Sequence, residues 1–92
     1  MTYSILFSDE AKLDYALLIR SGDKVLLQKL NKLLKELEEH PETGTGKPER
    51  LKNNLSGYWS RELSKKHRLV YDIDKELITI IVVQCYGHYN DK

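Results

Sequence analysis

Residues 24–39 have the apolar spacing of a buried helix. The leucines of this stretch recur at intervals of four, three and four residues, which places them on one face of an α-helix. They are Leu26, Leu30, Leu33 and Leu37. Asp23 precedes the stripe as an N-cap, and Pro41 follows it as a stop. Two turns of heptad repeat are too few for a coiled coil, so we predict that this face packs into a core.

A shorter helix is predicted just before it, from Ser8 to about Ser21. Ser8 can cap the first turn, where the next two residues are acidic as the helix dipole favours, and Gly22 supplies the stop. In front of Ser8, apolar residues alternate from Tyr3 to Phe7, which predicts a short first strand.

After Pro41 and the turn-rich segment 41–50, the helical spacing gives way to short alternating or apolar stretches. They predict strands at 51–53, 58–63, 68–73 and 77–86. The last stretch is apolar on both faces, as expected of a central strand. We therefore predict an α+β fold for a single domain, residues 1–92. In it, two N-terminal helices pack on one face of a four- to five-stranded, mainly antiparallel sheet.

Bulk properties exclude several classes of protein. The N-terminus has no basic region of a signal peptide, and the longest apolar run, Ile78 to Val83, is too short to cross a bilayer. The single cysteine, Cys85, cannot form an internal disulfide. These observations predict a cytoplasmic protein without a membrane association.

The net charge of +1 hides an uneven distribution. Residues 47–68, the basic segment, hold seven Lys or Arg and two Glu, which gives +5, whereas the remainder holds eight basic and twelve acidic residues, which gives −4. A basic surface of this kind suits phosphates. Lysines that protect a sheet edge would give the same pattern, so charge alone leaves both interpretations open.

One feature of the basic segment points to an anion. If Ser64 and Lys65 form the turn between the strands at 58–63 and 68–73, then Arg61 lies opposite Arg68. Like charges facing each other across a strand pair are destabilising. A bound phosphate would relieve that repulsion.

Metal and nucleotide-loop chemistry are disfavoured. Gly44-Thr45-Gly46-Lys47 lacks the Ser or Thr and the preceding strand of a phosphate-binding loop. Cys85 and His88 have half the spacing of a zinc site but no second pair of ligands nearby. The sequence predicts neither a metal nor a cofactor.

Cleavage of RNA by its own 2′-hydroxyl matches the remaining residues. It needs a base, a cation on the phosphorane oxygens and an acid for the departing 5′-oxygen. Glu49, the Arg61/Arg68 pair and His88 supply these groups. Predicted phosphate contacts and base-stacking aromatics complete the candidate RNA surface. They are Lys47, Lys52, Lys65, Lys66, Tyr58, Trp59, Tyr86 and Tyr89.

The segments GKPERLKNNLSGYWSRELSKKHRLVY (46–71) and CYGHY (85–89) resemble the YoeB branch of the RelE-like bacterial toxins, and the resemblance covers nearly the whole chain. It implies a RelE-like fold and a ribosome-dependent endoribonuclease. Such a toxin cuts mRNA in the A site without metal or cofactor and is silenced by a cognate antitoxin of the YefM or Phd type. A homodimer or a toxin–antitoxin hetero-oligomer is compatible with this resemblance.

The resemblance also implies a role for each site residue. Glu49 corresponds to the general base, Arg68 to the transition-state cation and His88 to the general acid. Tyr89 corresponds to the terminal aromatic that organises the site, and Lys52 to a phosphate contact. The chain departs from its relatives at Glu62, where an arginine is common, at Gly87, and in the extension 90–92.

Two other functions remain open at this point. A non-catalytic binder would occupy the ribosome or its antitoxin's operator complex without cutting RNA, and the departures at Glu62 and Gly87 keep this alternative open. A ribonuclease acting on naked RNA would use the same residues, but the basic segment is short for a long single strand.

Overall fold

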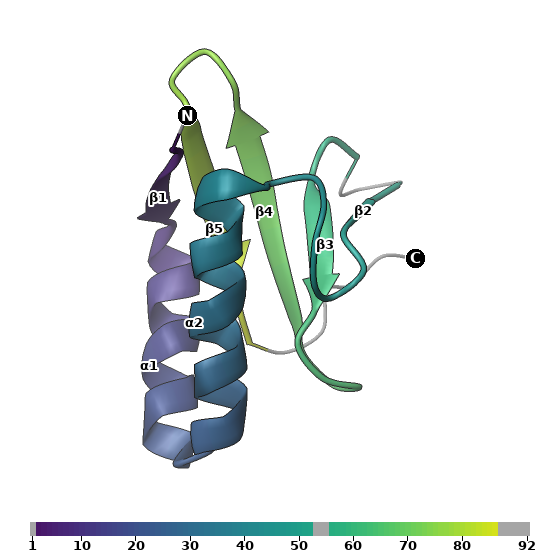
Figure 1. Ribbon diagram of the computed structural model, residues 1–92. Coiled ribbons are helices and arrows are strands. Elements are labelled where there is room, and N and C mark those ends of the chain that lie inside the picture. Colours follow the sequence, from purple (N-terminus) through teal and green to yellow (C-terminus); the bar gives the residue numbers. More distant parts are fainter. Residues whose placement is uncertain (1, 53–55, 87–92) are drawn as a thin grey trace.

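The computed structural model describes residues 2–52 and 56–86. Within these residues, two helices pack on a five-stranded sheet, as the sequence predicts (Figure 1). The elements in chain order are β1 (Ser4–Phe7), α1 (Asp9–Ser21), α2 (Lys24–Glu39), β2 (Glu49–Arg50), β3 (Trp59–Glu62), β4 (Arg68–Asp74) and β5 (Thr79–Gln84).

The strand order is β1-β5-β4-β3-β2. β1 pairs with β5 in parallel, and the other three pairings are antiparallel. The sheet is therefore mixed but mostly antiparallel. β5 has a strand on each side, which confirms the central position predicted from its apolar residues.

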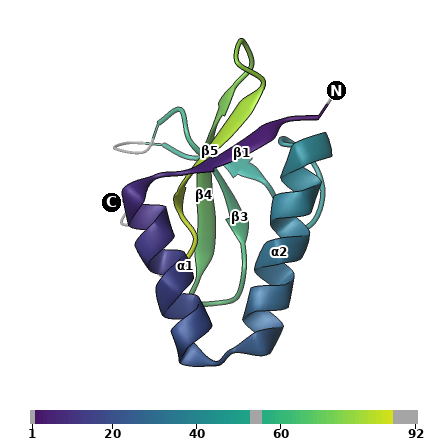
Figure 2. The ribbon, with the colours of Figure 1, turned by 90° about the vertical axis from the view of Figure 1, so that its left-hand side faces the viewer.

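The helix ends follow the sequence signals. The Ser8 hydroxyl accepts a hydrogen bond from the Ala11 amide at 3.1 Å, and the Asp23 carboxylate accepts one from the Leu26 amide at 3.0 Å. Gly22 ends α1 with φ +76°, a left-handed conformation that favours glycine. α1 and α2 form an antiparallel pair that meets at the short turn between them (Figure 2). No helix among the described residues is long and apolar enough to cross a membrane.

The leucine stripe of α2 is core, as predicted. Its four leucines are buried in one cluster with Ala11 and Leu18 of α1. From the sheet, Leu69, Tyr71, Ile80 and Val82 join the same cluster. The alternate residues of β4 therefore point away from the helices.

The predicted strand at 51–53 is wrong in position. β2 is Glu49–Arg50, and residue 53 lies outside the described residues. The Leu51 amide donates to the Tyr58 carbonyl at 2.9 Å, so the pairing of β2 with β3 ends at Leu51. The turn-forming residues of segment 41–50 predicted a loop up to Arg50, yet an edge strand readily accepts charged side chains such as those of Glu49 and Arg50.

The predicted register of β3 and β4 is wrong by one residue. Arg61 lies opposite Leu69, and Glu62 lies opposite Arg68. The loop 63–67 is closed by hydrogen bonds from the amides of Leu63 and Ser64 to the His67 carbonyl, at 3.0 and 3.1 Å, so it is longer than a Ser64-Lys65 turn. Arg61 and Arg68 therefore do not face each other. Arg68 faces Glu62 instead, and a pair of opposite charges across two strands is stabilising.

Candidate functional site

The sheet face away from the helices, called the open face below, carries the candidate chemistry. Directly opposed residues of an antiparallel pair project to the same side. Glu49 opposes Ser60, and Ser60 opposes Val70, so these three form a row across β2, β3 and β4. Arg68 precedes Val70 by two residues on β4 and shares its side. The observed strand pairing therefore places Glu49 and Arg68 on one surface.

Glu49 and Arg68 are brought together as an ion pair. The Arg68 Nη1 lies 3.8 Å from the Glu49 Oε1, with 29% of the arginine side chain and 57% of the glutamate side chain exposed. This separation exceeds hydrogen-bond reach, and exposed pairs contribute little to stability. The pair can therefore open at small energetic cost and receive a phosphate beside the carboxylate.

Four predicted phosphate contacts lie within three residues of Glu49 or Arg68 in the chain. Lys47 and Lys52 flank β2, whereas Lys65 and Lys66 lie in the loop 63–67. All four lysines are exposed. Their charge is thus available to an anionic partner.

Trp59 lies on the other side of the sheet. It opposes Tyr71, packs against the core, and has the Arg50 guanidinium 5.8 Å from its ring centroid. The structure does not bring Trp59 onto the face that carries Glu49 and Arg68.

His88 and Tyr89 lie outside the described residues, as do Gly87 and the extension 90–92. The last described residue, Tyr86, stacks on His67 with 4.3 Å between ring centroids and an interplanar angle of 8°. His67 precedes Arg68, so the chain beyond β5 reaches position 86 next to the start of β4.

A pocket of about 260 Å³ opens near the start of β4 and the end of β5. The register of β4 and β5 shifts between Val70 and Tyr71, which leaves Val83 without an opposed partner. Bulges of this kind are frequent beside active sites. The pocket is lined by Ser8, Glu10, Tyr58, Val70, Val83 and Gln84.

Sequence reasoning missed Ser60. Its side chain is fully buried in the row between Glu49 and Val70, and its Oγ has no hydrogen-bond partner among the described residues. Buried hydroxyls without partners are rare. The neighbours of Ser60 in the chain, Trp59 and Arg61, do not indicate that its side chain is buried on the open face.

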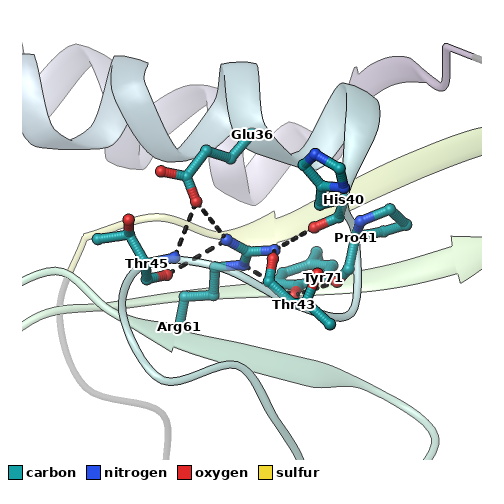
Figure 3. Close-up of polar contacts among 7 residues, drawn as sticks. All are labelled: Glu36, His40, Pro41, Thr43, Thr45, Arg61 and Tyr71. Atoms are coloured by element: carbon teal, nitrogen blue, oxygen red, sulfur yellow. Dashed lines mark hydrogen bonds and ion pairs between the residues drawn. The ribbon is translucent and has the colours of Figure 1, made fainter.

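Arg61 is the largest departure from the sequence-based site. Its side chain is 0% exposed and points toward α2, so it cannot contact RNA as predicted (Figure 3). Residues 40–46, called the clamp loop below, surround its guanidinium. The acceptors of the five guanidinium N–H groups are the Glu36 carboxylate, the Tyr71 hydroxyl and the carbonyls of His40, Thr43 and Thr45.

The electrostatics of this cluster agree with a charged, buried arginine. Burial acts to raise the pKa of Glu36, but hydrogen bonds from Thr45 and the charge of Arg61 outweigh it, so this pKa lies below its ordinary value. Burial raises the pKa of Tyr71 despite the nearby guanidinium. The Tyr71 hydroxyl stays neutral and donates to the Pro41 carbonyl at 2.7 Å.

Cys85 is a core residue. Burial, assisted by the charge of Asp14, raises the pKa of its thiol to about 12. Its amide donates to the Asp14 carboxylate at 3.2 Å, which ties β5 to α1. Within residues 2–52 and 56–86, no group of three or more His, Cys, Asp or Glu could hold a metal ion.

Comparison with known proteins identifies the family. Residues 7–89 match the model of the YoeB-like toxin of bacterial type II toxin–antitoxin systems. Toxin YoeB of a Synechocystis strain is 45% identical over 86 residues, which cover 92% of this chain and 95% of that protein.

Solved structures give the same result. A YoeB/ParE toxin from Agrobacterium tumefaciens is 34% identical with a TM-score of 0.86, covering 94% of this chain and 99% of that one. YoeB of Staphylococcus aureus, solved as a dimer, is 40% identical with a TM-score of 0.81, covering 97% of this chain and 100% of that one. A heterotetrameric YoeB–YefM toxin–antitoxin complex from Staphylococcus aureus, 40% identical with a TM-score of 0.80, has also been solved. The chain described here belongs to the YoeB-like toxins of bacterial type II toxin–antitoxin systems.

Proposed function

We propose that this toxin is a ribosome-dependent endoribonuclease that cleaves mRNA in the A site and so inhibits translation. The observation that carries the proposal is the pairing of Glu49 with Arg68 on the open face. It sets a carboxylate and a guanidinium 3.8 Å apart, and Glu49 lies in a segment of the chain that carries exposed lysines. A base and a cation at this spacing suit attack by a 2′-hydroxyl on the adjacent phosphate.

In this mechanism Glu49 takes the proton of the 2′-hydroxyl, whose oxygen forms a bond to phosphorus. Arg68 stabilises the negative charge that builds on the phosphorane oxygens. The bond from phosphorus to the 5′-oxygen then breaks, and His88 donates the proton that this oxygen needs. The products are a 2′,3′-cyclic phosphate and a 5′-hydroxyl. Side chains fill all three roles, so the reaction as proposed takes no metal.

The roles of His88 and Tyr89 rest on family resemblance, because both residues lie outside the described residues. Tyr86 stacks on His67, the neighbour of Arg68. We assign to Tyr89 the positioning of the base or the acid.

We further propose that an antitoxin of the YefM type binds this toxin in the cytoplasm and covers the basic segment. The Staphylococcus aureus relative forms a heterotetrameric complex with YefM and also a dimer. The exposed lysines 47, 52, 65 and 66 offer an acidic or amphipathic antitoxin segment complementary charge. The same lysines would contact mRNA or ribosomal RNA when the antitoxin is absent.

Mapping of 5′ ends on one defined message tests the enzymatic function. The protein is incubated with that message, with and without programmed ribosomes, beside Glu49→Gln, Arg68→Ala and His88→Ala variants. We expect cuts inside the A-site codon that require the ribosome and all three residues. Cuts on naked RNA would show a free ribonuclease, and stalled ribosomes on intact message would show a binder; either result overturns the proposal.

A further inference from the structure

The Arg61 side chain binds the segment of the chain that precedes the candidate base, Glu49. The clamp loop connects α2 to Lys47, Pro48 and then Glu49. Three carbonyls of this loop accept hydrogen bonds from the guanidinium, those of His40, Thr43 and Thr45. A fourth, the Pro41 carbonyl, accepts one from the Tyr71 hydroxyl, which itself accepts from the Arg61 Nε at 3.2 Å. One buried cation thereby holds the loop from one end to the other (Figure 3).

Hydrogen bonds also attach the clamp loop to α2 and to the sheet. Glu36 of α2 accepts hydrogen bonds from the Arg61 Nη1 at 3.0 Å and from the Thr45 amide at 2.9 Å. Arg61 and Tyr71 are neighbours in the sheet, on β3 and β4. The loop therefore has one anchor on a helix, the partly exposed Glu36, and two buried anchors on the sheet.

The end of the loop leads directly into β2. The Glu62 amide donates to the Gly46 carbonyl at 2.7 Å, and three residues later Glu49 opposes Ser60. Gly46 has φ +87°, and a Cβ there would lie 3.0 Å from the Glu62 carbonyl oxygen and 3.2 Å from the Arg61 Cβ. This close approach leaves the chain little freedom between the clamp and the Glu49 carboxylate.

We propose that Arg61 is a positioning residue for the reaction. It holds the clamp loop in place so that β2 pairs with β3 and presents Glu49 to Arg68 at the observed 3.8 Å. Arg61 is buried, so it acts through the clamp loop and not by contact with substrate. The effect that we expect on catalysis rests on the proposed function. β2 has few other restraints, since it is a two-residue edge strand.

Arg61→Lys is the main test, with Tyr71→Phe as a milder second variant. A lysine keeps the charge but has three donors on one nitrogen, so it cannot serve five acceptors in a planar fork. Phenylalanine removes only the hydroxyl, which accepts from the Arg61 Nε and donates to the Pro41 carbonyl. Leu30→Ala serves as the control, because it weakens the core of α2 at a residue outside the clamp.

The first readout is independent of activity. Amide hydrogen exchange is followed at Thr45 and Glu62, whose amides bond to Glu36 and Gly46, and at the core residue Leu33. We expect exchange at Thr45 and Glu62 to rise at least tenfold in Arg61→Lys with little change at Leu33. In Leu30→Ala the protection of all three amides should fall together. Unchanged exchange at Thr45 and Glu62 in both clamp variants would overturn the proposal.

The second readout is steady-state cleavage on programmed ribosomes at a temperature where all variants are folded. We expect kcat of Arg61→Lys to fall at least tenfold, while the half-saturating ribosome concentration changes less than threefold because the exposed lysines are intact. Leu30→Ala should keep the wild-type kcat. A wild-type kcat in Arg61→Lys would overturn the inference. If the wild type itself does not cut, the proposed function fails, and hydrogen exchange alone decides whether the clamp exists.

Discussion

The Glu36 carboxylate and the Arg61 guanidinium form an ion pair of 3.0 Å between α2 and β3. The arginine side chain is fully buried, whereas 23% of the glutamate side chain is exposed. A buried guanidinium is stable only where its N–H groups are paired, and in this chain carbonyls of the clamp loop complete the pairing. The stability of the fold and the position of the loop before Glu49 therefore depend on the same contacts.

Glu36→Gln should lower the free energy of unfolding at pH 7 by about 1–2 kcal/mol, because an amide oxygen replaces a charged acceptor. The effect should shrink in acid. The pKa of Glu36 in the folded chain lies below its ordinary value of 4.5, so the folded chain binds fewer protons there than the unfolded chain. This contribution is complete above about pH 4.5 and is lost as pH falls through the folded-state pKa.

Urea unfolding of both proteins between pH 7 and pH 3 measures the Glu36 effect. The two stability curves should converge as the pH is lowered. Glu76→Gln, at an exposed turn position, corrects for the loss of one negative charge. A gap between wild type and Glu36→Gln that stays constant to pH 3 would contradict the assigned ion pair.

Arg61 shows where sequence reasoning reached its limit. Helix ends, the leucine stripe and the central last strand were predictable because capping residues and apolar spacing act locally. The burial of Arg61 depends on carbonyls 16 to 21 residues earlier in the chain, which no local pattern reveals. A shift of one residue in the β3–β4 register was enough to turn a supposed arginine pair into the Glu62/Arg68 pair.

The other residues of the candidate site also include some that the sequence predicted and some that it did not. The pairing of Glu49 with Arg68 agrees with the roles that family resemblance implies for them, although the chemistry itself stays a prediction. Ser60 was not predictable, since its place in the row depends on strand pairing. His88 and Tyr89 lie outside the described residues, so their roles stay predictions as well.

Gly46→Ala should destabilise the fold more than Gly22→Ala. Both glycines have a positive φ, +87° and +76°, so an alanine is strained at either position. At Gly22 nothing lies within 4 Å of an added Cβ, whereas at Gly46 it would lie 3.0 Å from the Glu62 carbonyl oxygen. Because both positions share the backbone strain, the excess comes from the crowded Cβ, and we expect Gly46→Ala to cost about 1–3 kcal/mol beyond the control, a range typical of overpacking. Thermal and urea unfolding measure the difference, and equal costs would show that the loop can move away from β3.

Cys85 should resist thiol reagents in the folded protein. With a pKa of about 12, only about one thiol in 10⁴ is ionised at pH 8, and the thiolate is the reactive form. A colorimetric disulfide reagent should therefore label the native chain at least about 10³-fold more slowly than the chain unfolded in guanidinium chloride. The labelling rate of the native chain should rise with urea concentration in step with global unfolding. Rapid labelling without denaturant would contradict the buried position.

Lys65 and Lys66 should contribute to ribosome binding through charge alone. Both are exposed in the loop between β3 and β4, and neither belongs to the Glu49–Arg68 pair. Replacing both with alanine should weaken binding at low salt and reduce the slope of log K against log salt concentration by about 1 for each lysine that neutralises a phosphate. Binding is measured with programmed ribosomes and proteins that also carry Glu49→Gln, so that the message stays intact.

A pair of exposed lysines on α2 supplies the matched control for this experiment. Lys24→Ala with Lys32→Ala removes the same net charge from a helix that lies on the other side of the sheet from Glu49 and Arg68. If binding follows net charge only, both double variants will lose equal affinity and equal salt dependence. If the basic segment is the contact surface, as proposed, only the Lys65/Lys66 variant will change the slope, because counterions are released only where lysines meet phosphates.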